Sequence, residues 1–339
     1  MKKTIRSLLF LLLSLSFFHQ AVAADTLSAV QERDKLRCGV NGQLLGFSFR
    51  DDRGRWQGMD VDFCRAVAAA VLGDAQKVTF VPLTNAARLD AFKGDRIDLL
   101  ARNTTWTLSR DTEYGLSFVG VFYFDGQAFM VPRAAQRISA LELSGVPLCV
   151  QSGTTSLDNV QGYFARNRMK LRLQVYPDLD SAAKAYLSGE CGALTGDHSQ
   201  LQALRTVLQE PRAHRILPEI ISKEPLSPAV PKGDARWFDI VRWTLFTLIN
   251  AEEMGIDANN VDQALALASR AETRRLLDVE GGVARQLGLS PGWAVRIIRL
   301  GNYGELFDRN LGAHSPLKMK RGLNALWNNG GLLYAPPSR

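Results

Sequence analysis

Short apolar runs separated by polar turns alternate with apolar residues at helical spacing along the first part of the chain. This alternation predicts strand, helix, strand, helix and strand, the order typical of a mostly parallel sheet covered by helices. An alternating pattern around an Asp-Asp-Arg-Gly turn predicts a hairpin before the first helix. The five elements span residues 35–42, 61–73, 77–83, 85–95 and 96–101.

The same pattern restarts in the middle of the chain and predicts a second α/β lobe of about 100 residues. Its strands are expected at 146–153, 171–177 and 191–196, with helices at 154–167 and 179–190. The chain then leaves this lobe through a segment whose three prolines, Pro225, Pro228 and Pro231, favour extended backbone.

The last third is mainly helical, with apolar residues at helical spacing over 235–255, 261–270, 271–278 and 293–311. Two α/β lobes imply a cleft, and ligands favour the carboxyl ends of the strands that face it. We expect residues 24–124 to form the first part of lobe 1 and 125–226 to form lobe 2. Residues 227–339 would complete lobe 1 and add a helical C-terminal extension.

The N-terminus has the pattern of a secretory signal peptide over residues 1–23. Three basic residues precede an apolar run, Leu8 to Phe18, and Ala21-Val22-Ala23 fits a cleavage site after Ala23. The apolar run is shorter than the roughly 20 residues of a spanning helix, which disfavours a membrane anchor. The chain is therefore expected in the periplasm.

The 316 residues that follow this segment are enough for two domains of about 150 residues each. Removing its three basic residues lowers the formal net charge from +7 to +4. The remaining basic residues are scattered, which gives little support to nucleic-acid binding. The spacing of His, Ser and acidic residues predicts neither a metal site nor a catalytic triad, so no cofactor is expected.

Four cysteines in an exported chain favour disulfides, because the compartment is oxidising. Two lie near the start of the mature chain and two near its middle, which favours one bridge in each lobe. The predicted pairs are Cys38–Cys64 and Cys149–Cys191. The absence of a Cys-x-x-Cys motif disfavours zinc and dithiol redox chemistry, and an oxidising compartment disfavours free thiols.

The stretch "RNTTWTLSRD", residues 102–111, collects hydrogen-bonding groups directly after a predicted buried strand. Arg110 is a permanently charged fork suited to a bidentate hold on a carboxylate. Asn103 and Thr105 stand where the strand ends and a cleft would open. Taken alone, this stretch is better interpreted as a solvated turn.

Two further groups come from the second predicted lobe. In "SGTTS" a strand runs into a helix, and the N–H groups at a helix start can bind an anion, with Thr154 beside them. Asp197 follows an apolar strand and is suited to an ammonium group. Helix capping alone explains most of the first feature, and it is at least as good an interpretation of Asp197. Together, the two lobes offer the partners that both charged groups of an α-amino acid require.

The chain resembles the polar-amino-acid-type periplasmic solute-binding proteins of ABC importers, especially the general L-amino-acid-binding subunits. The resemblance rests on "GMDVDFCRAVAAAVLG", "RNTTWTLSRDT", "CVQSGTTS" and "ISKEPLSP", and it spans almost the whole mature chain. The ending "GNYGELFDRNLG" followed by "RGLNALWNNGGLLYAPP" is specific to that subgroup. The resemblance implies a type II periplasmic-binding-protein fold with a central cleft, and it supports the two predicted disulfides.

The resemblance also implies roles for individual residues. Arg110 would hold the ligand α-carboxylate with Thr105 and Thr154, and Asp197 would pair with the α-ammonium group with help from Asn103. Many relatives place the ligand side chain between two aromatic residues. Phe47 is expected at one of these positions and the non-aromatic Asn85 at the other. Arg102 is expected either to contact an acidic ligand side chain or to brace the strand end, and bracing is favoured.

The expected function is capture of L-amino acids by hinge closure, followed by delivery to the permease of an ABC transporter in the inner membrane. The protein would act as a monomer without catalysis. An enzyme on the same fold, similar to cyclohexadienyl dehydratase, is a weaker alternative because no general acid stands out beside the binding groups. A sensory module that uses the same cleft is the third hypothesis.

Overall fold

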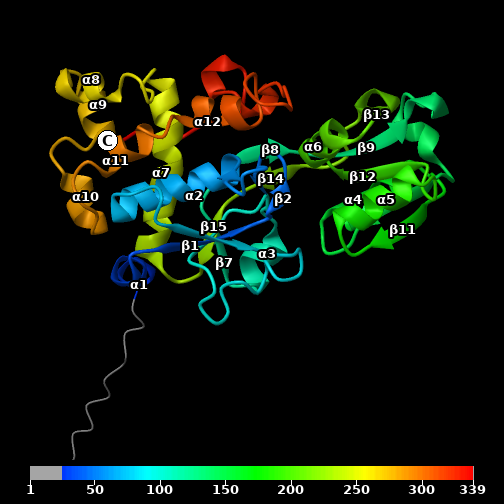
Figure 1. Ribbon diagram of the computed structural model, residues 1–339, viewed down its shortest axis with the longest axis horizontal. Coiled ribbons are helices and arrows are strands. Elements are labelled where there is room, and N and C mark those ends of the chain that lie inside the picture. Colours follow the sequence, from blue (N-terminus) through cyan, green and yellow to red (C-terminus); the bar gives the residue numbers. More distant parts are fainter. Residues whose placement is uncertain (1–24, 339) are drawn as a thin grey trace, which may run out of the picture.

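Two five-stranded sheets organise the computed structural model, which describes residues 25–338 (Figure 1). The predicted signal peptide and its cleavage site lie outside these residues. In the first sheet β1 is parallel to β5 and β6, and β15 is antiparallel to β6 and β7. Its strand order is β5 (Val78–Pro82), β1 (Leu36–Val40), β6 (Leu99–Leu100), β15 (Ala229–Pro231) and β7 (Leu116–Phe118).

The second sheet has the same kind of mixed topology. Strands β11, β10 and β12 are parallel, whereas β9 is antiparallel to both β12 and β13. The order is β11 (Arg172–Tyr176), β10 (Pro147–Gln151), β12 (Ala193–Asp197), β9 (Gln127–Pro132) and β13 (His214–Ile216). The two α/β lobes expected from the sequence are thus present, and we call them the first and second lobe.

Two short antiparallel strands lie between the lobes (Figure 1). They are β8 (Tyr123–Asp125) and β14 (Glu224–Leu226), and Glu224 pairs with Asp125 in their register. We call β8 and β14 the hinge strands, because the chain passes from one sheet to the other along them. The exact division at residues 125 and 226 stays a prediction.

Helices cover both sheets where apolar residues recur at helical spacing. The helix predicted over 61–73 is α2 (Met59–Leu72), and Gly73 follows its last residue in a left-handed conformation. The predicted hairpin is a three-stranded antiparallel ribbon of β2 (Gln43–Leu44), β3 (Ser48–Arg50) and β4 (Trp56–Gln57). The other helices of the two lobes are α1 (Thr26–Arg33), α3 (Leu108–Glu113), α4 (Ser156–Arg166), α5 (Leu179–Leu187) and α6 (His198–Val207).

The prediction of a helix over 85–95 was wrong, because this segment forms turns. Its backbone bonds are isolated, from Arg88 N–H to the Thr84 carbonyl and from Lys93 N–H to the Asp90 carbonyl. Ala91 is fully buried in a small core with Leu100 and Phe118 of the first sheet. Tertiary packing therefore overrides the local helical pattern, and it also buries the side chain of Arg88.

The last third forms the predicted helical extension, and it packs on the first lobe (Figure 1). The predicted helix over 293–311 is two helices, because Gly301 adopts φ +118° and Asn302 caps a new helix. Short 3-10 turns follow near the C-terminus. The helices are α7 (Ala235–Glu253), α8 (Val261–Ala266), α9 (Ala271–Leu276), α10 (Gly282–Leu287), α11 (Trp293–Ile298) and α12 (Tyr303–Asn310).

Polar contacts fix the extension to α2. Asp62, the second acid of the Gly-x-Asp-x-Asp motif, accepts bonds from Arg309 Nε at 2.8 Å and Asn310 Nδ2 at 2.7 Å. Arg296 Nε donates to the Ala69 carbonyl at 2.9 Å. The extension and the first lobe also share one apolar core, which includes the fully buried Trp237. We therefore treat them as one body.

Both predicted disulfides are confirmed. Cys38 of β1 is bonded to Cys64 of α2, and Cys149 of β10 is bonded to Cys191, just before β12. Each bridge joins elements within one lobe, so neither prevents the lobes from moving relative to each other. Among residues 25–338, no helix combines the length and apolar composition needed to cross a bilayer.

Candidate functional site

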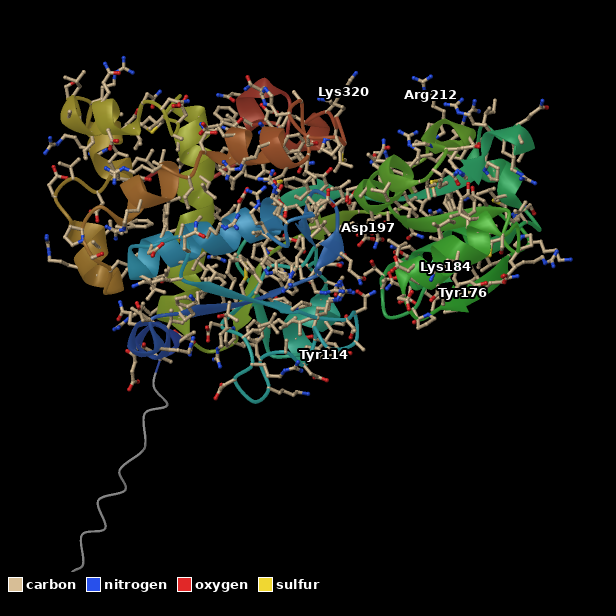
Figure 2. All side chains as sticks on the ribbon, viewed as in Figure 1. Tyr114, Tyr176, Lys184, Asp197, Arg212 and Lys320 are labelled. Atoms are coloured by element: carbon tan, nitrogen blue, oxygen red, sulfur yellow. A yellow bond between two sulfur atoms is a disulfide. The ribbon has the colours of Figure 1, made fainter. Side chains whose placement is uncertain are left out.

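A small cavity lies where the carboxyl ends of strands from both sheets meet, and we call it the inner cavity. Its volume is about 20 Å³. Figure 2 shows Asp197 between the two lobes. Five of the predicted site residues line this cavity. The full lining is Asn85, Arg88, Asn103 and Thr105 from the first lobe, with Gln151, Thr154, Thr155, Ser156, Asp197 and Gln200 from the second.

The end of β6 reaches the cavity through a strained backbone conformation. Asn103 has φ +36°, and its N–H donates to Asp60 Oδ2 at 3.2 Å. Burial raises the pKa of Asp60 to about 7, opposed by this hydrogen bond and by nearby Arg102. Asp60, the first acid of the stretch "GMDVD", therefore fixes the backbone just after the end of β6. Asn103 Oδ1 accepts a bond from Asn41 Nδ2 at 3.3 Å.

Arg110 lies behind the cavity wall and is not among the residues that line it. Its side chain is 6% exposed, and Nη1 donates to the Thr105 carbonyl at 2.9 Å. Burial lowers the pKa of Arg110, and the carboxylates of Glu224 and Asp197 oppose this effect. Its charge is thus close to the cavity, with the backbone of Thr105 as its hydrogen-bond partner.

The guanidinium that lines the cavity belongs to Arg88, which the sequence analysis did not single out. Arg88 is 4% exposed, and its Nη2 donates across the lobes to the Gly153 carbonyl at 3.4 Å. Its Nε has no hydrogen-bond partner among the described residues. Burial and the charges of Arg102 and Arg110 lower the pKa of Arg88 well below its usual range. In the sequence, Arg88 resembled an ordinary polar position on a surface helix.

Glu224 of the hinge strand β14 is a second residue that the sequence analysis missed. It is 1% exposed and joins the lobes, accepting bonds from Thr105 Oγ1 at 2.7 Å and Thr155 Oγ1 at 2.8 Å. Asn159 Nδ2 also donates to it at 2.7 Å. The only sequence signal was an acidic residue within the proline-rich segment that leaves the second lobe.

Asp197 ends β12 and immediately precedes α6, but its side chain makes no capping hydrogen bond to that helix. Asp197 therefore occupies the N-cap position of α6 without the side-chain hydrogen bond that the capping alternative requires. Burial raises its pKa well above the usual range, and the carboxyl groups of Asp125 and Glu224 add to the shift. Arg88 and Arg110 oppose it. A cation that enters beside Asp197 would favour its ionised form.

Thr154 and Arg102 also have defined partners. Thr154 Oγ1 donates to the Gln151 carbonyl at 2.9 Å, which fixes the loop after β10. Arg102 Nε donates to the Leu83 carbonyl at 2.8 Å, so Arg102 braces the end of β6 against the end of β5. This hydrogen bond supports the bracing role predicted for Arg102. Arg102 also lines a second, larger space beside the inner cavity.

That neighbouring space is a larger opening of about 710 Å³, which we call the outer cleft. It shares Asn85, Gln151 and Gln200 with the inner cavity, so the two spaces are adjacent. Phe47, by contrast, lines none of the described cavities. It is 1% exposed and packs edge-on against Tyr123, with ring centroids 5.3 Å apart. Phe47 therefore belongs to the apolar core next to the hinge strand β8, and it does not form the ligand-contacting wall predicted from the sequence.

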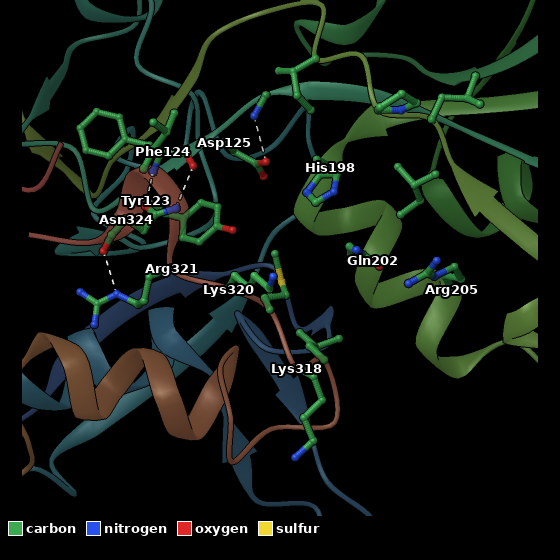
Figure 3. A pocket seen from close by; sticks show the side chains of 18 residues that line it. Tyr123, Phe124, Asp125, His198, Gln202, Arg205, Lys318, Lys320, Arg321 and Asn324 are labelled. Atoms are coloured by element: carbon green, nitrogen blue, oxygen red, sulfur yellow. Dashed lines mark hydrogen bonds between the residues drawn. The ribbon is translucent and has the colours of Figure 1, made fainter. Parts of the chain in front are cut away.

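A third cavity of about 740 Å³, the rear cavity, lies between the second lobe and the C-terminal segment 317–324 (Figure 3). Here Asn324 contacts the hinge strand β8. The backbone N–H of Phe124 donates to Asn324 Oδ1 at 2.7 Å, and Asn324 Nδ2 donates to the Phe124 carbonyl at 3.0 Å. The extension therefore holds β8 through both backbone groups of one residue. Within residues 25–338, no group of three or more His, Cys, Asp or Glu side chains is arranged to hold a metal ion.

Known proteins resemble this chain over nearly its full length. The general L-amino acid-binding periplasmic protein AapJ of Rhizobium johnstonii is 49% identical over 322 residues, 94% of each chain. The glutamate/glutamine/aspartate/asparagine-binding protein BztA of Rhodobacter capsulatus is 46% identical over 320 residues, 94% of this chain and 95% of its own. A cyclohexadienyl dehydratase of Pseudomonas aeruginosa is more distant, at 23% identity over 207 residues, 60% of this chain and 76% of its own.

Among solved structures, an ABC transporter periplasmic binding protein from Brucella ovis with glutathione bound is 50% identical. It superposes with a TM-score of 0.90 and covers 93% of this chain and 100% of its own. The family model for bacterial extracellular solute-binding proteins, family 3, matches residues 36–256. That match spans both sheets and the hinge strands, and the relatives extend it through the C-terminal helices. The chain therefore belongs to family 3 of the bacterial extracellular solute-binding proteins.

Proposed function

We propose that this protein captures L-amino acids in the periplasm by closure of its two lobes and delivers them to the permease of an ABC transporter. The observation that carries the proposal is the arrangement of charge around the inner cavity. Guanidinium groups come from the first lobe, and the carboxylate of Asp197 comes from the second. An α-amino acid offers one group of each sign, so it can pair with both lobes at once.

In this proposal Arg88 and Arg110 hold the ligand α-carboxylate. Arg88 lines the cavity, and Arg110 would reach the carboxylate in the open form by giving up its bond to the Thr105 carbonyl. The hydroxyl groups of Thr105 and Thr154 assist. Asp197 pairs with the α-ammonium group, with the amide of Asn103 beside it.

Ligand entry requires the lobes to separate. A cavity of about 20 Å³ has room for about one water molecule, so even the head of an amino acid enters only an open form. Closure then follows because both lobes contact the ligand. AapJ and BztA carry names for amino-acid binding, and glutathione also carries a free α-amino and α-carboxylate head.

Calorimetry of Arg110→Ala and Arg88→Ala with the common L-amino acids tests this proposal. Each variant should weaken binding of every amino acid by roughly a hundredfold, because a desolvated carboxylate loses a charged partner. Arg53→Ala, on an exposed turn of the hairpin, should bind like the unmodified protein. Unchanged affinity in both site variants would place the carboxylate elsewhere.

A dehydratase is the second candidate, because the raised pKa of Asp197 supplies a carboxyl group that can donate a proton inside the cavity. We expect no turnover of prephenate or arogenate by the purified protein, and measurable turnover would favour catalysis over transport. A sensory role would use the same cleft, and a pull-down of the membrane partner would distinguish it.

We expect a monomer, which light scattering can test. We expect the mature chain to begin at Ala24, which an intact-mass measurement can test. We also expect no affinity for nucleic acid.

A further inference from the structure

The outer cleft is far larger than the side chain of an ordinary amino acid requires. At about 710 Å³ it falls in the range of pockets that bury drug-sized ligands, roughly 300–1,000 Å³. It joins the inner cavity along Asn85, Gln151 and Gln200, three amide side chains that can donate and accept hydrogen bonds. A ligand anchored in the inner cavity would therefore pass its side chain between these amides into the cleft.

The walls of the outer cleft differ in charge. Arg50 and Arg102 line it from the first lobe, whereas Asp178 and Asp180 line it from the start of α5 in the second. Asp178 is engaged, because it caps α5 by accepting a bond from the Ser181 N–H at 2.7 Å. A negatively charged end of a ligand would be repelled by the acidic wall and attracted to the basic one.

Arg102, one of the residues of the basic wall, also has a buried donor without a partner. Its side chain is 4% exposed, and Nη1 has no hydrogen-bond partner among the described residues. Buried donors of this kind carry a desolvation cost until an acceptor arrives. A ligand carbonyl that enters beside Arg102 would supply that acceptor. Arg50, an exposed residue of the same wall, has its guanidinium over the Trp56 ring, 4.7 Å from the ring centroid.

We infer that the outer cleft binds the peptide portion of γ-glutamyl peptides whose α-amino and α-carboxylate groups occupy the inner cavity. The inference rests on the proposed function, because the inner cavity must first hold the amino-acid head. An α-linked peptide has no free α-carboxylate on its first residue, so it cannot present that head. A γ-linked peptide keeps both α groups and extends only from the side chain. Its γ-carbonyl meets Arg102, and its terminal carboxylate meets Arg50.

Binding measurements with matched peptides test the linkage. We expect reduced glutathione and γ-glutamylglycine to bind within about tenfold of L-glutamine, and α-glutamylglycine to bind at least about a hundredfold more weakly. If glutamine binds and neither γ-glutamyl peptide does, the inference is wrong and the proposed function stands. Equal binding of the α- and γ-linked peptides would also overturn the inference. If no free amino acid binds, the proposed function fails and this inference fails with it.

A charge reversal tests the location. Arg50→Glu should lower the ratio of glutathione affinity to glutamine affinity by about tenfold, because it removes the attraction for the terminal carboxylate. Arg53→Glu reverses a charge on the same hairpin without lining the cleft, and it should leave the ratio unchanged. An equal change of the ratio in both variants would assign the effect to net charge and would contradict binding in the outer cleft.

Discussion

Single buried charges decide what the inner cavity can bind. Arg88, Arg110 and Glu224 are buried, Asp197 is partly buried beside them, and the charges that surround each one come from both lobes. A buried charge is tolerated only where opposite charges or hydrogen bonds compensate it. In the structure these charges are compensated by contacts with one another, and an amino acid bound as proposed would exchange these contacts for its own.

The first prediction concerns the proton on Asp197. Its pKa is raised by burial and by neighbouring carboxyl groups, whereas a bound ammonium group would lower it. Binding at mildly acidic pH should therefore release a proton, and affinity should fall as the pH falls. Calorimetry in two buffers of different ionisation enthalpy measures the number of protons released. Asp197→Asn should bind weakly and release none, and the absence of proton release from the unmodified protein would contradict the pairing.

At the scale of elements, hydrophobic periodicity predicted the parallel strands of both sheets and several of the helices, and the positions of the cysteines predicted both disulfides. It did not predict the turns at 85–95, because these depend on packing against β6 and β7, which are distant in sequence. Arg88 and Glu224 were missed for the same reason, since their burial is balanced only across the assembled lobes. Phe47 is the opposite case. It was predicted to contact the ligand because it is aromatic, but its position in the β2–β3–β4 ribbon directs its side chain into the core.

The second prediction concerns the element that carries the site. Strand β6 has only two residues, and its continuation is held by Asp60, whose pKa is raised to about 7 from an ordinary value of 3.8. Because the folded pKa is the higher one, the contribution of Asp60 to stability declines as the pH rises from about 4 to about 7. Asp60→Asn removes this titration while an amide oxygen can still accept the Asn103 N–H bond.

The free energy of unfolding of Asp60→Asn, relative to the unmodified protein, should therefore increase between about pH 5 and pH 8. The increase should be at most about 3 kcal/mol, since only about two of the roughly three units between the unfolded and folded pKa values lie above pH 5. Urea unfolding at the two pH values measures it. Asp52→Asn, an exposed change in the neighbouring hairpin, should follow the unmodified protein, and parallel behaviour of both variants would exclude Asp60 as the source.

At the scale of the whole molecule, the two hinge strands have different attachments. β8 is held by Asn324 of the extension, which in turn shares the core of the first lobe. Just beyond it, a side chain at Gly126 would approach Ile220 Cγ2 within 2.2 Å, so this crossing is closely packed. β14 carries Glu224, which bonds to residues of both lobes. We therefore expect the second lobe to move relative to the first by backbone rotation after Asp125. The hydrogen bonds of Glu224 across the lobes must break when the lobes open.

The last prediction follows from this contact between the lobes. Glu224→Met keeps the length of the side chain but leaves the hydroxyls of Thr105 and Thr155 without their shared acceptor. Because Thr105 belongs to the first lobe and Thr155 to the second, the variant loses a contact that holds the lobes together, and water can satisfy both hydroxyls once the lobes separate. The unliganded variant should be more open, and small-angle scattering should give it a larger radius of gyration than the unmodified protein.

Amino-acid affinity of Glu224→Met should fall by about tenfold, because ligand must now also supply the free energy of closure. Saturating ligand should return its radius of gyration to that of the liganded, unmodified protein. Glu224→Gln, which keeps one acceptor, should give an intermediate result, and the exposed change Glu210→Gln should have no effect. A Glu224→Met variant that stays closed without ligand would contradict the prediction. Other contacts would then hold the lobes together, and Glu224 would contribute to the stability of the fold and not to closure.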